Sequence, residues 1–170
     1  MPTLKQAALF AALTGLRYCD LRQLRWSSVH YGEEVGYQLR FRQQKTGSVE
    51  TMPLSEAAYG LLRERPAEDT LLFAGLPLAL GNSANAYIKA WVKAAGIEKH
   101  ITFHCFRHSF ATLQLTLGVD IYTVSKLLGH KEVKTTQIYG RIVDEKKRSA
   151  AERLGAVWQE AVAGSMQGNA

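Results

Sequence analysis

The sequence predicts a mainly α-helical domain with a small antiparallel β-sheet, and three observations point to this α+β class. A chain of 170 residues with 46% hydrophobic and 21% charged residues has the size and composition of one globular domain. Apolar residues recur at helical spacing through most of the chain. Between residues 29 and 53 they alternate instead, in two short runs around a glycine-containing turn.

The first predicted helix spans residues 4–16 and is rich in Ala and Leu. Gly15 lies near its C-terminal end, where glycine readily adopts the left-handed conformation that ends a helix. A second, shorter helix is predicted over residues 18–26. Asp20 falls in its first turn, where a carboxylate interacts favourably with the helix dipole.

The predicted sheet contains two strands joined by a tight turn at Thr46-Gly47. The first run covers residues 37–41 and the second residues 49–53, with apolar or β-branched side chains at alternate positions. Such runs around a short turn that contains glycine are typical of a β-hairpin.

The rest of the chain is predicted to be helical apart from a loop over residues 66–81. Ser55 and Asp120 each precede a predicted helix and are of the type that caps helix N-termini. The tail after residue 163 is expected to be disordered. The individual helices are predicted over residues 55–63, 82–95, 121–128, 133–142 and 144–162, and the chain after Gly96 is predicted to be helical throughout.

Net charge and cysteine content narrow the function classes. The formal charge of +6 and the sequence pI of about 9.4 favour polyanionic partners such as nucleic acid. Two cysteines, Cys19 and Cys105, form no disulfide framework, which is typical of the reduced cytosol. We find no secretory signal and no apolar run long enough to span a bilayer, so we expect a cytoplasmic protein with no membrane partner.

Six side chains spread along the sequence suit one chemistry. Two arginines, a lysine and two histidines can surround a phosphate with positive charge and hydrogen-bond donors, and a tyrosine can attack it. This set predicts phosphoryl transfer through a covalent phosphotyrosine, with double-stranded DNA as substrate. In chain order the six residues are Arg17, Lys45, His104, Arg107, His130 and Tyr139.

Each of the six also has an ordinary structural interpretation. An arginine presents a planar fork that matches two phosphate oxygens, but it can equally form a surface salt bridge. Lys45 lies beside the predicted turn, where it can protonate a leaving oxygen or simply be solvated. His130 can cap a helix end. Tyr139 needs nearby cations and a base to lose its proton, because the pKa of a phenol is near 10.

His104 and His108 lie four residues apart and could hold a metal on one helix face. Cys105 occupies the position where a His-Glu-x-x-His zinc hydrolase carries its glutamate, and no nearby carboxylate completes a site. A metal hydrolase is therefore the least favoured alternative, and we expect neither a metal nor a cofactor.

The order and local sequence of these residues resemble the catalytic domain of the tyrosine recombinase, or phage integrase, family over about residues 4–154. The resemblance implies that Tyr139 attacks a DNA phosphodiester and that Lys45 protonates the departing 5′ oxygen. The residues that would stabilise the transition state are Arg17, Arg107, His104 and His130. Asp20 and His108 receive supporting roles around them. The matching segments are TGLRYCDL, QQKTGS, HCFRHSFAT, LLGHK and TTQIYGR.

The resemblance also implies a domain organisation and partners. Residues 1–163 would form the catalytic domain, with the family's N-terminal core-binding domain absent from this chain. The implied function is site-specific recombination that integrates or excises a mobile element. The family assembles as a tetramer on DNA, and we expect the isolated domain to be mostly monomeric. A C-terminal apolar stripe would pack on its own domain or on a neighbouring protomer; it comprises Ala151, Leu154, Trp158 and Val162.

Two further alternatives remain open at the level of sequence. A type IB topoisomerase-like enzyme shares the chemistry but relaxes supercoils instead of exchanging strands. A catalytically idle DNA-binding module would tolerate replacement of Tyr139 by Phe without any change in behaviour.

Overall fold

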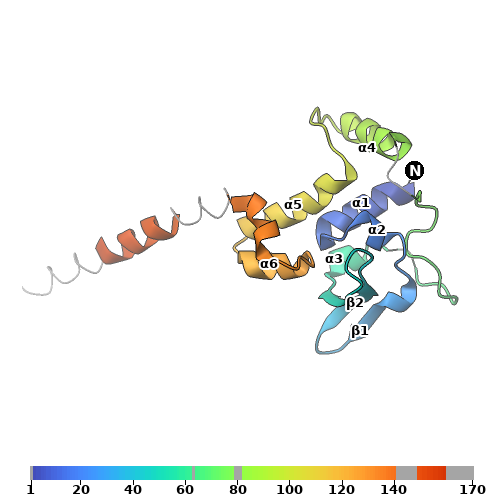
Figure 1. Ribbon diagram of the computed structural model, residues 1–170, viewed down its shortest axis with the longest axis horizontal. Coiled ribbons are helices and arrows are strands. Elements are labelled where there is room, and N and C mark those ends of the chain that lie inside the picture. The colour runs from blue at the N-terminus through green and yellow to red at the C-terminus, as the bar shows by residue number, and fades with distance from the viewer. Residues whose placement is uncertain (1, 63, 79–81, 141–148, 160–170) are drawn as a thin grey trace, which may run out of the picture.

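The computed structural model describes residues 2–62, 64–78, 82–140 and 149–159 and has the predicted mainly α-helical architecture with a small sheet (Figure 1). Residues 149–159 are also helical. The named elements are α1 (Pro2–Thr14), α2 (Tyr18–Leu21), η1 (Trp26–Ser28), β1 (Val29–Gly32), β2 (Gly36–Arg42), β3 (Val49–Pro53), α3 (Glu56–Tyr59), α4 (Asn82–Ala94), α5 (Phe103–Thr116), α6 (Ile121–Leu127) and η2 (Val133–Tyr139), where η denotes a 3₁₀ helix.

Helix α1 packs along α5 and confirms the first predicted helix. Gly15 ends it with a φ of +70°, as expected for a helix-terminating glycine. A Cβ atom at this position would lie 2.6 Å from the ring of Phe110, so only glycine allows α5 to approach the end of α1 this closely.

The second helix is shorter than the sequence predicted. Helix α2 ends at Leu21, and Trp26 begins a 3₁₀ turn. Arg25 forms an isolated antiparallel bridge with Leu71, and the Trp26 amide donates to the Thr70 carbonyl at 3.1 Å. These long-range contacts hold the backbone extended at a point where local spacing favoured a helix.

The sheet has three antiparallel strands in the order β1-β2-β3. The β2–β3 hairpin is confirmed, with Leu39 opposite Met52 and both side chains buried. Strand β1 was missed, because its short segment has only one buried residue, Val29, and depends on pairing with β2. Val49 is exposed, so the buried face of β3 is carried by Met52.

The caps predicted at Ser55 and Asp120 are confirmed. The Ser55 hydroxyl accepts from the Ala58 amide at 3.2 Å, although α3 ends at Tyr59, earlier than expected. The Asp120 carboxylate accepts from the Thr123 amide at 2.9 Å at the start of α6. The predicted helix over 133–142 is a 3₁₀ helix through Tyr139, and its last two residues lie outside the described part of the chain.

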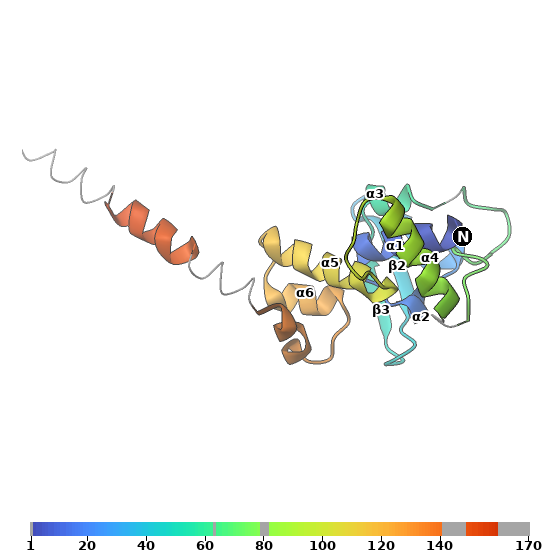
Figure 2. The ribbon, with the colours of Figure 1, turned by 90° about the horizontal axis from the view of Figure 1, so that it is seen from above.

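The buried side chains form two separate clusters. The larger one joins α1, the sheet, α3, α4 and the start of α5, and it includes Phe103. The smaller one joins the second half of α5 to α6 and includes Phe110. Helix α5 runs through both, and α6 lies beside it in both ribbon views (Figure 2). The residues of α5 between Phe103 and Phe110 therefore lie where the two clusters meet.

The helix over residues 149–159 exposes its apolar side chains. Leu154 and Trp158 are 72% and 71% exposed, so the alternative in which this stripe packs on its own domain is not observed for these residues. Val162 and the tail 164–170 lie outside the described residues. Among the described residues, no helix is both long and apolar enough to cross a membrane.

Candidate active site

Arg107 lies on α5 where the two hydrophobic clusters meet, and it is 6% exposed. Its Nη1 donates to the carbonyl of Gly15, and its Nη2 donates to the carbonyl of Leu128 at 2.7 Å. These two carbonyls end α1 and α6, where helix carbonyls lack intrahelical partners. One guanidinium thus connects three helices and remains oriented toward the site.

Arg17 enters the site from the turn between α1 and α2. Its Nη1 lies 3.4 Å from Oε1 of Gln43 and 4.0 Å from Oδ2 of Asp20. Asp20 is almost fully buried, and its Oδ1 accepts from the backbone amide of Gln44 at 2.8 Å. The carboxylate therefore joins α2 to the hairpin turn and neutralises part of the charge of Arg17.

His130 contacts Arg107 directly. Its Nε2 lies 3.0 Å from Arg107 Nη2, and its Nδ1 lies 2.8 Å from the hydroxyl of Thr136. A guanidinium has no acceptor, so Nε2 must accept and the ring proton must reside on Nδ1, which donates to Thr136. Thr136 is fully buried in η2 and fixes this tautomer.

Gly129 places His130 at the end of α6 and also contacts the hairpin. Its φ is +60°, and a Cβ atom there would lie 1.8 Å from Nε2 of Gln43. Gln43 is buried, and its Oε1 also accepts from the Thr46 hydroxyl at 2.9 Å. The absence of a side chain at Gly129 thus lets one amide connect Arg17, the hairpin turn and the loop that carries His130.

The electrostatics of the site are those of a receptor for an anion. Burial and the charges of Arg107, Arg17 and Lys45 lower the pKa of His130 to about 4. Burial and Arg17 lower the pKa of Arg107 to about 10, so this guanidinium stays charged at neutral pH. Several cations therefore act on one small region that holds one buried carboxylate, Asp20, among the described residues. A bound phosphate would relieve their mutual repulsion.

Tyr139 ends η2 and packs against the smaller cluster. Its hydroxyl lies 2.7 Å from Nδ1 of His108 on α5. Burial raises the pKa of Tyr139, and the nearby charge of Arg107 opposes that effect. The rings of His108 and His104 meet edge to face with centroids 4.4 Å apart. Burial and the neighbouring His108, Arg107 and Arg17 lower the pKa of His104.

Lys45 lies in the turn between β2 and β3 and is exposed. Its ammonium is close enough to contribute to the lowered pKa of His130. The hairpin turn that carries it is closed by the Gln43 amide, which donates to the Ser48 carbonyl at 2.8 Å. Lys45 therefore extends from a hydrogen-bonded turn near His130, and its side chain is exposed.

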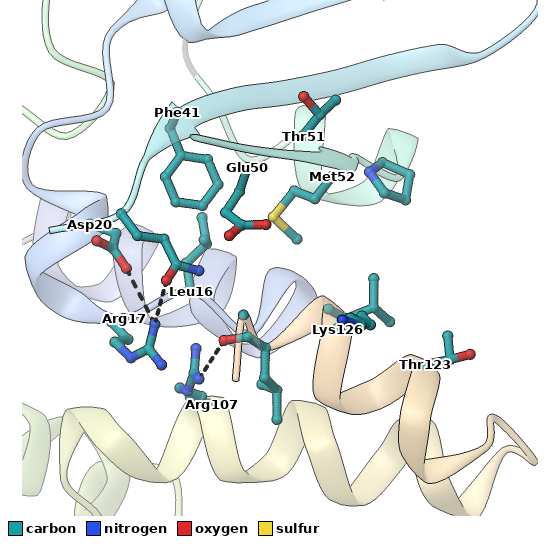
Figure 3. Close-up of a pocket in the computed structure, with 15 residues that line it drawn as sticks. Leu16, Arg17, Asp20, Phe41, Glu50, Thr51, Met52, Arg107, Thr123 and Lys126 are labelled. Carbon is teal, nitrogen blue, oxygen red and sulfur yellow. Dashed lines mark hydrogen bonds and ion pairs between the residues drawn. The ribbon is translucent and has the colours of Figure 1, made fainter. Parts of the chain in front are cut away.

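A cavity of about 220 Å³ lies beside the two arginines, between the β2–β3 hairpin, the segment that follows α1, and α6. Figure 3 shows Arg17 and Arg107 at one end of this cavity, and Lys126 and Thr123 at the other. Phe41 and Met52 of the sheet line it as well. Of the six predicted residues, only Arg17 and Arg107 line this cavity; Lys45, His104, His130 and Tyr139 do not.

The structure brings the six predicted residues into one neighbourhood through contacts or electrostatic influence. Sequence reasoning missed Gln43 and Thr136, the two buried polar residues that orient Arg17 and His130. Gln43 stands two residues before Lys45 and Thr136 stands three before Tyr139, but nothing in the local pattern distinguishes them from exposed polar residues. Within the described residues, no three His, Cys, Asp or Glu side chains are grouped to hold a metal.

The fold and the site together define a mainly α-helical domain that places a tyrosine near a cluster of cations. The sequence matches the model of the phage integrase family over residues 3–146, and the chain belongs to this family. Tyrosine recombinase XerA of Pyrococcus furiosus is 32% identical over 149 residues, covering 82% of this chain and 50% of that protein. Tyrosine recombinase XerD of Corynebacterium glutamicum is 43% identical over 108 residues, covering 59% and 33%.

Solved structures share the fold. The catalytic domain of bacteriophage HP1 integrase matches with a TM-score of 0.61 at 22% identity, covering 86% of this chain and 79% of that one. A lambda integrase dimer bound to a COC′ core site matches with a TM-score of 0.63 at 25% identity, covering 81% and 41%. The predicted tyrosine recombinase catalytic-domain fold is confirmed. The chain spans a third to a half of the two curated relatives described above.

Proposed function

We propose that this chain is the catalytic domain of a site-specific recombinase that cleaves and rejoins double-stranded DNA through a 3′-phosphotyrosyl intermediate. The observation that carries the proposal is the cluster of Arg17, Arg107 and Lys45 around His130, whose pKa is lowered to about 4 by burial and by these three charges. Such a site favours an anion, and Tyr139 lies within the field of Arg107. Membership of the phage integrase family and the named recombinase relatives support the same chemistry.

In the proposed cleavage step, the hydroxyl oxygen of Tyr139 attacks the scissile phosphorus and the bond to the 5′ oxygen breaks. Lys45 gives that oxygen a proton, because an alkoxide is a poor leaving group. Arg17 and Arg107 bind the non-bridging oxygens as negative charge develops on them. A 5′ hydroxyl of a partner strand then attacks the phosphotyrosine, returns its proton to Lys45 and releases the tyrosine.

His130 and His104 are the two histidines that would contact the bound phosphate. In the free site Nε2 of His130 accepts from Arg107. A bound phosphate would raise the pKa of His130 and allow this nitrogen to donate to a phosphate oxygen instead. His104 is exposed beside Arg107 on α5 and can reach an anion from the solvent side. Because the link to the protein conserves the energy of the phosphodiester, the reaction requires no ATP and no metal.

The DNA partner would be held mainly through its backbone. Lys and Arg contacts to phosphates position a protein without reading sequence, so binding by this domain should be weak and steeply dependent on salt. We infer that strand exchange takes place in a tetramer on DNA, with the exposed stripe of Leu154 and Trp158 offered to a neighbouring protomer. The finer proposal, integration or excision of a mobile element, rests on the resemblance of the QQKTGS hairpin.

Covalent trapping tests the proposal directly. The chain is incubated with nicked duplexes whose sequence is randomised on both sides of the nick, so that cleavage releases a short 5′-hydroxyl fragment and cannot be reversed. We expect an adduct that survives denaturation, forms in the presence of a chelator and maps to Tyr139. Tyr139→Phe should form none, while Tyr122→Phe, at an exposed tyrosine on α6, serves as the matched control.

An adduct on another residue, or equal adduct from Tyr139→Phe, would contradict the proposal. Sequencing the trapped duplexes would identify the preferred site. A plasmid carrying two copies of that site then separates the outcomes, because recombinant products indicate strand exchange and relaxation alone indicates a topoisomerase.

A further inference from the structure

One hydrogen bond in the site has no role in the mechanism above. The hydroxyl of Tyr139 and Nδ1 of His108 lie 2.7 Å apart, although the two residues are 31 positions apart in the sequence. This is the only side-chain hydrogen bond of Tyr139 among the described residues. The rings also contact edge to face, with centroids 5.7 Å apart. The nucleophile proposed for cleavage is therefore already paired with an imidazole before DNA binds.

Cleavage needs a group that removes the phenol proton. Burial raises the pKa of Tyr139 above its ordinary value, so the phenolate is scarce at neutral pH unless a base assists. A general base must lie within hydrogen-bonding reach of the proton that it takes. His108 satisfies this condition, and an imidazole is well matched to proton transfer near neutral pH.

The other candidate bases are occupied or misplaced. Both ring nitrogens of His130 are engaged, one by Arg107 and the other by Thr136. The Asp20 carboxylate accepts a hydrogen bond from the backbone amide of Gln44 and lies beside Arg17, so it is already engaged. His104 has no hydrogen bond to the phenol, and its ring lies against the ring of His108.

We propose that His108 is the general base that takes the proton of Tyr139 during cleavage and returns it when the tyrosine leaves. The inference rests on the proposed function, because it concerns the same nucleophile. The phenol O–H bond breaks as the Nδ1–H bond forms, and the phenolate oxygen then forms its bond to phosphorus. On rejoining, the imidazolium gives the same proton back to the departing phenolate, so proton and charge balance over the cycle.

The arrangement also explains the pairing of two histidines on α5. Burial and the cations around it keep the pKa of His104 low, so this neighbour stays neutral and does not oppose a positive charge on His108. The imidazolium formed on His108 would face a developing phenolate and phosphorane, both negatively charged. Its positive charge is therefore stabilised in the transition state and less so before it.

His108→Gln tests this role against a purely structural one. Glutamine can still hold the phenol by a hydrogen bond, but its neutral amide cannot accept a proton as a base. We expect the rate of adduct formation in the trapping assay to fall by about 10²–10⁴-fold, the usual contribution of general acid–base catalysis. His108→Ala should fall similarly and recover in part with added imidazole, while circular dichroism and thermal unfolding show that the variants remain folded.

A modified substrate separates this proton transfer from the one at the leaving group. In a duplex whose 5′ bridging oxygen is replaced by sulfur, the thiolate leaves without protonation. This substrate should restore cleavage by Lys45→Ala and leave His108→Gln and His108→Ala impaired. Restoration of the His108 variants would overturn the proposal, because it would place His108 on the leaving-group side.

Near wild-type cleavage by a folded His108→Gln variant would also overturn the proposal and leave only a positioning role. In the same trapping experiment, a Tyr139 adduct formed by the wild-type chain would still support the proposed function. If the wild-type chain itself forms no adduct on Tyr139, the proposed function fails, and the inference about His108 fails with it.

Discussion

The two sides of the candidate site are built differently. On one side, Arg17, Gln43, Arg107 and His130 are buried or half-buried, and hydrogen bonds connect them to one another or to the ends of helices. On the other side, Lys45 and His104 are exposed, and Tyr139 has one side-chain hydrogen bond among the described residues, to His108. We call these the arginine side and the tyrosine side.

This difference suggests that the fold places phosphate-binding groups and reacting groups on separate sides of the candidate site. The arginine side lies where the two hydrophobic clusters meet, so the same contacts that hold the clusters together orient the cations in advance. The tyrosine side carries the groups that we propose form bonds or move protons, and such groups must change position during a reaction. Substitutions on the arginine side should therefore affect stability and binding together, whereas those on the tyrosine side should affect rate alone.

Of the substitutions that compare the two sides, the one with the largest expected effect is at Lys45. Lys45→Ala should lower the rate of cleavage of an ordinary phosphodiester by about 10²–10⁴-fold, because the leaving oxygen loses its proton donor. Its melting temperature should remain within about a degree of wild type, since the side chain is exposed and makes no described hydrogen bond. Single-turnover trapping and thermal unfolding measure the two quantities. A clear loss of stability would place Lys45 on the arginine side.

Arg107→Ala should be the most destabilising change on the arginine side. It leaves the carbonyls of Gly15 and Leu128 without their buried donor, at a cost of about 2–4 kcal/mol in the free energy of unfolding. Arg17→Ala is the matched control, because the Arg17 guanidinium makes polar contacts only with the side chains of Gln43 and Asp20 among the described residues, and at longer distances. This substitution should lower the free energy of unfolding by less than half as much as Arg107→Ala. Denaturant unfolding provides both values, and equal costs would contradict the distinction.

Gly129 tests the packing between the hairpin and the loop of His130. Gly129→Ala should cost roughly 2–3 kcal/mol, because a left-handed φ is unfavourable for alanine and its Cβ overlaps the amide of Gln43. Gly47→Ala has a similar φ of +73° but meets no atom within 4 Å, so it should cost about 1–2 kcal/mol.

The double variant Gln43→Ala/Gly129→Ala should lose less stability than the sum of the two single variants, because Gln43→Ala removes the amide that the new Cβ would overlap. Strict additivity of the two substitutions in denaturant unfolding would show that the overlap is relieved in some other way.

The smallest effect is the pH dependence due to His130. Its pKa is about 4 in the fold and near 6.5 in the unfolded chain, so the unfolded chain binds the proton first as the pH falls. Stability should therefore decline from pH 6.5 toward pH 4 and lose no more below that range from this group. His130→Gln should show a shallower decline over the same window, measured by denaturant unfolding at several pH values. Identical slopes would mean that His130 is not neutral in the free site.

Much of the fold was predictable because its signals are local. Caps such as Ser55 and Asp120 and the terminating Gly15 act through residues a few positions away, so short patterns identify them. Strand β1 and the early end of α2 were not predictable, because they depend on pairing with β2 and with the loop at Leu71. The six candidate residues were chosen from their chemistry and order in the sequence, whereas Gln43 and Thr136 became visible only through their contacts in the structure.

The sequence by itself determined which reactive groups the chain carries, in what order, and which family it resembles, because residue identity and spacing are properties of the chain. Only the tertiary structure decided which groups are fixed and which are free. Burial where the two clusters meet fixes Arg107 and lowers the pKa of His130, and long-range packing brings His108 to the hydroxyl of Tyr139. Both effects come from desolvation and contact between segments far apart in the chain, which no local pattern encodes.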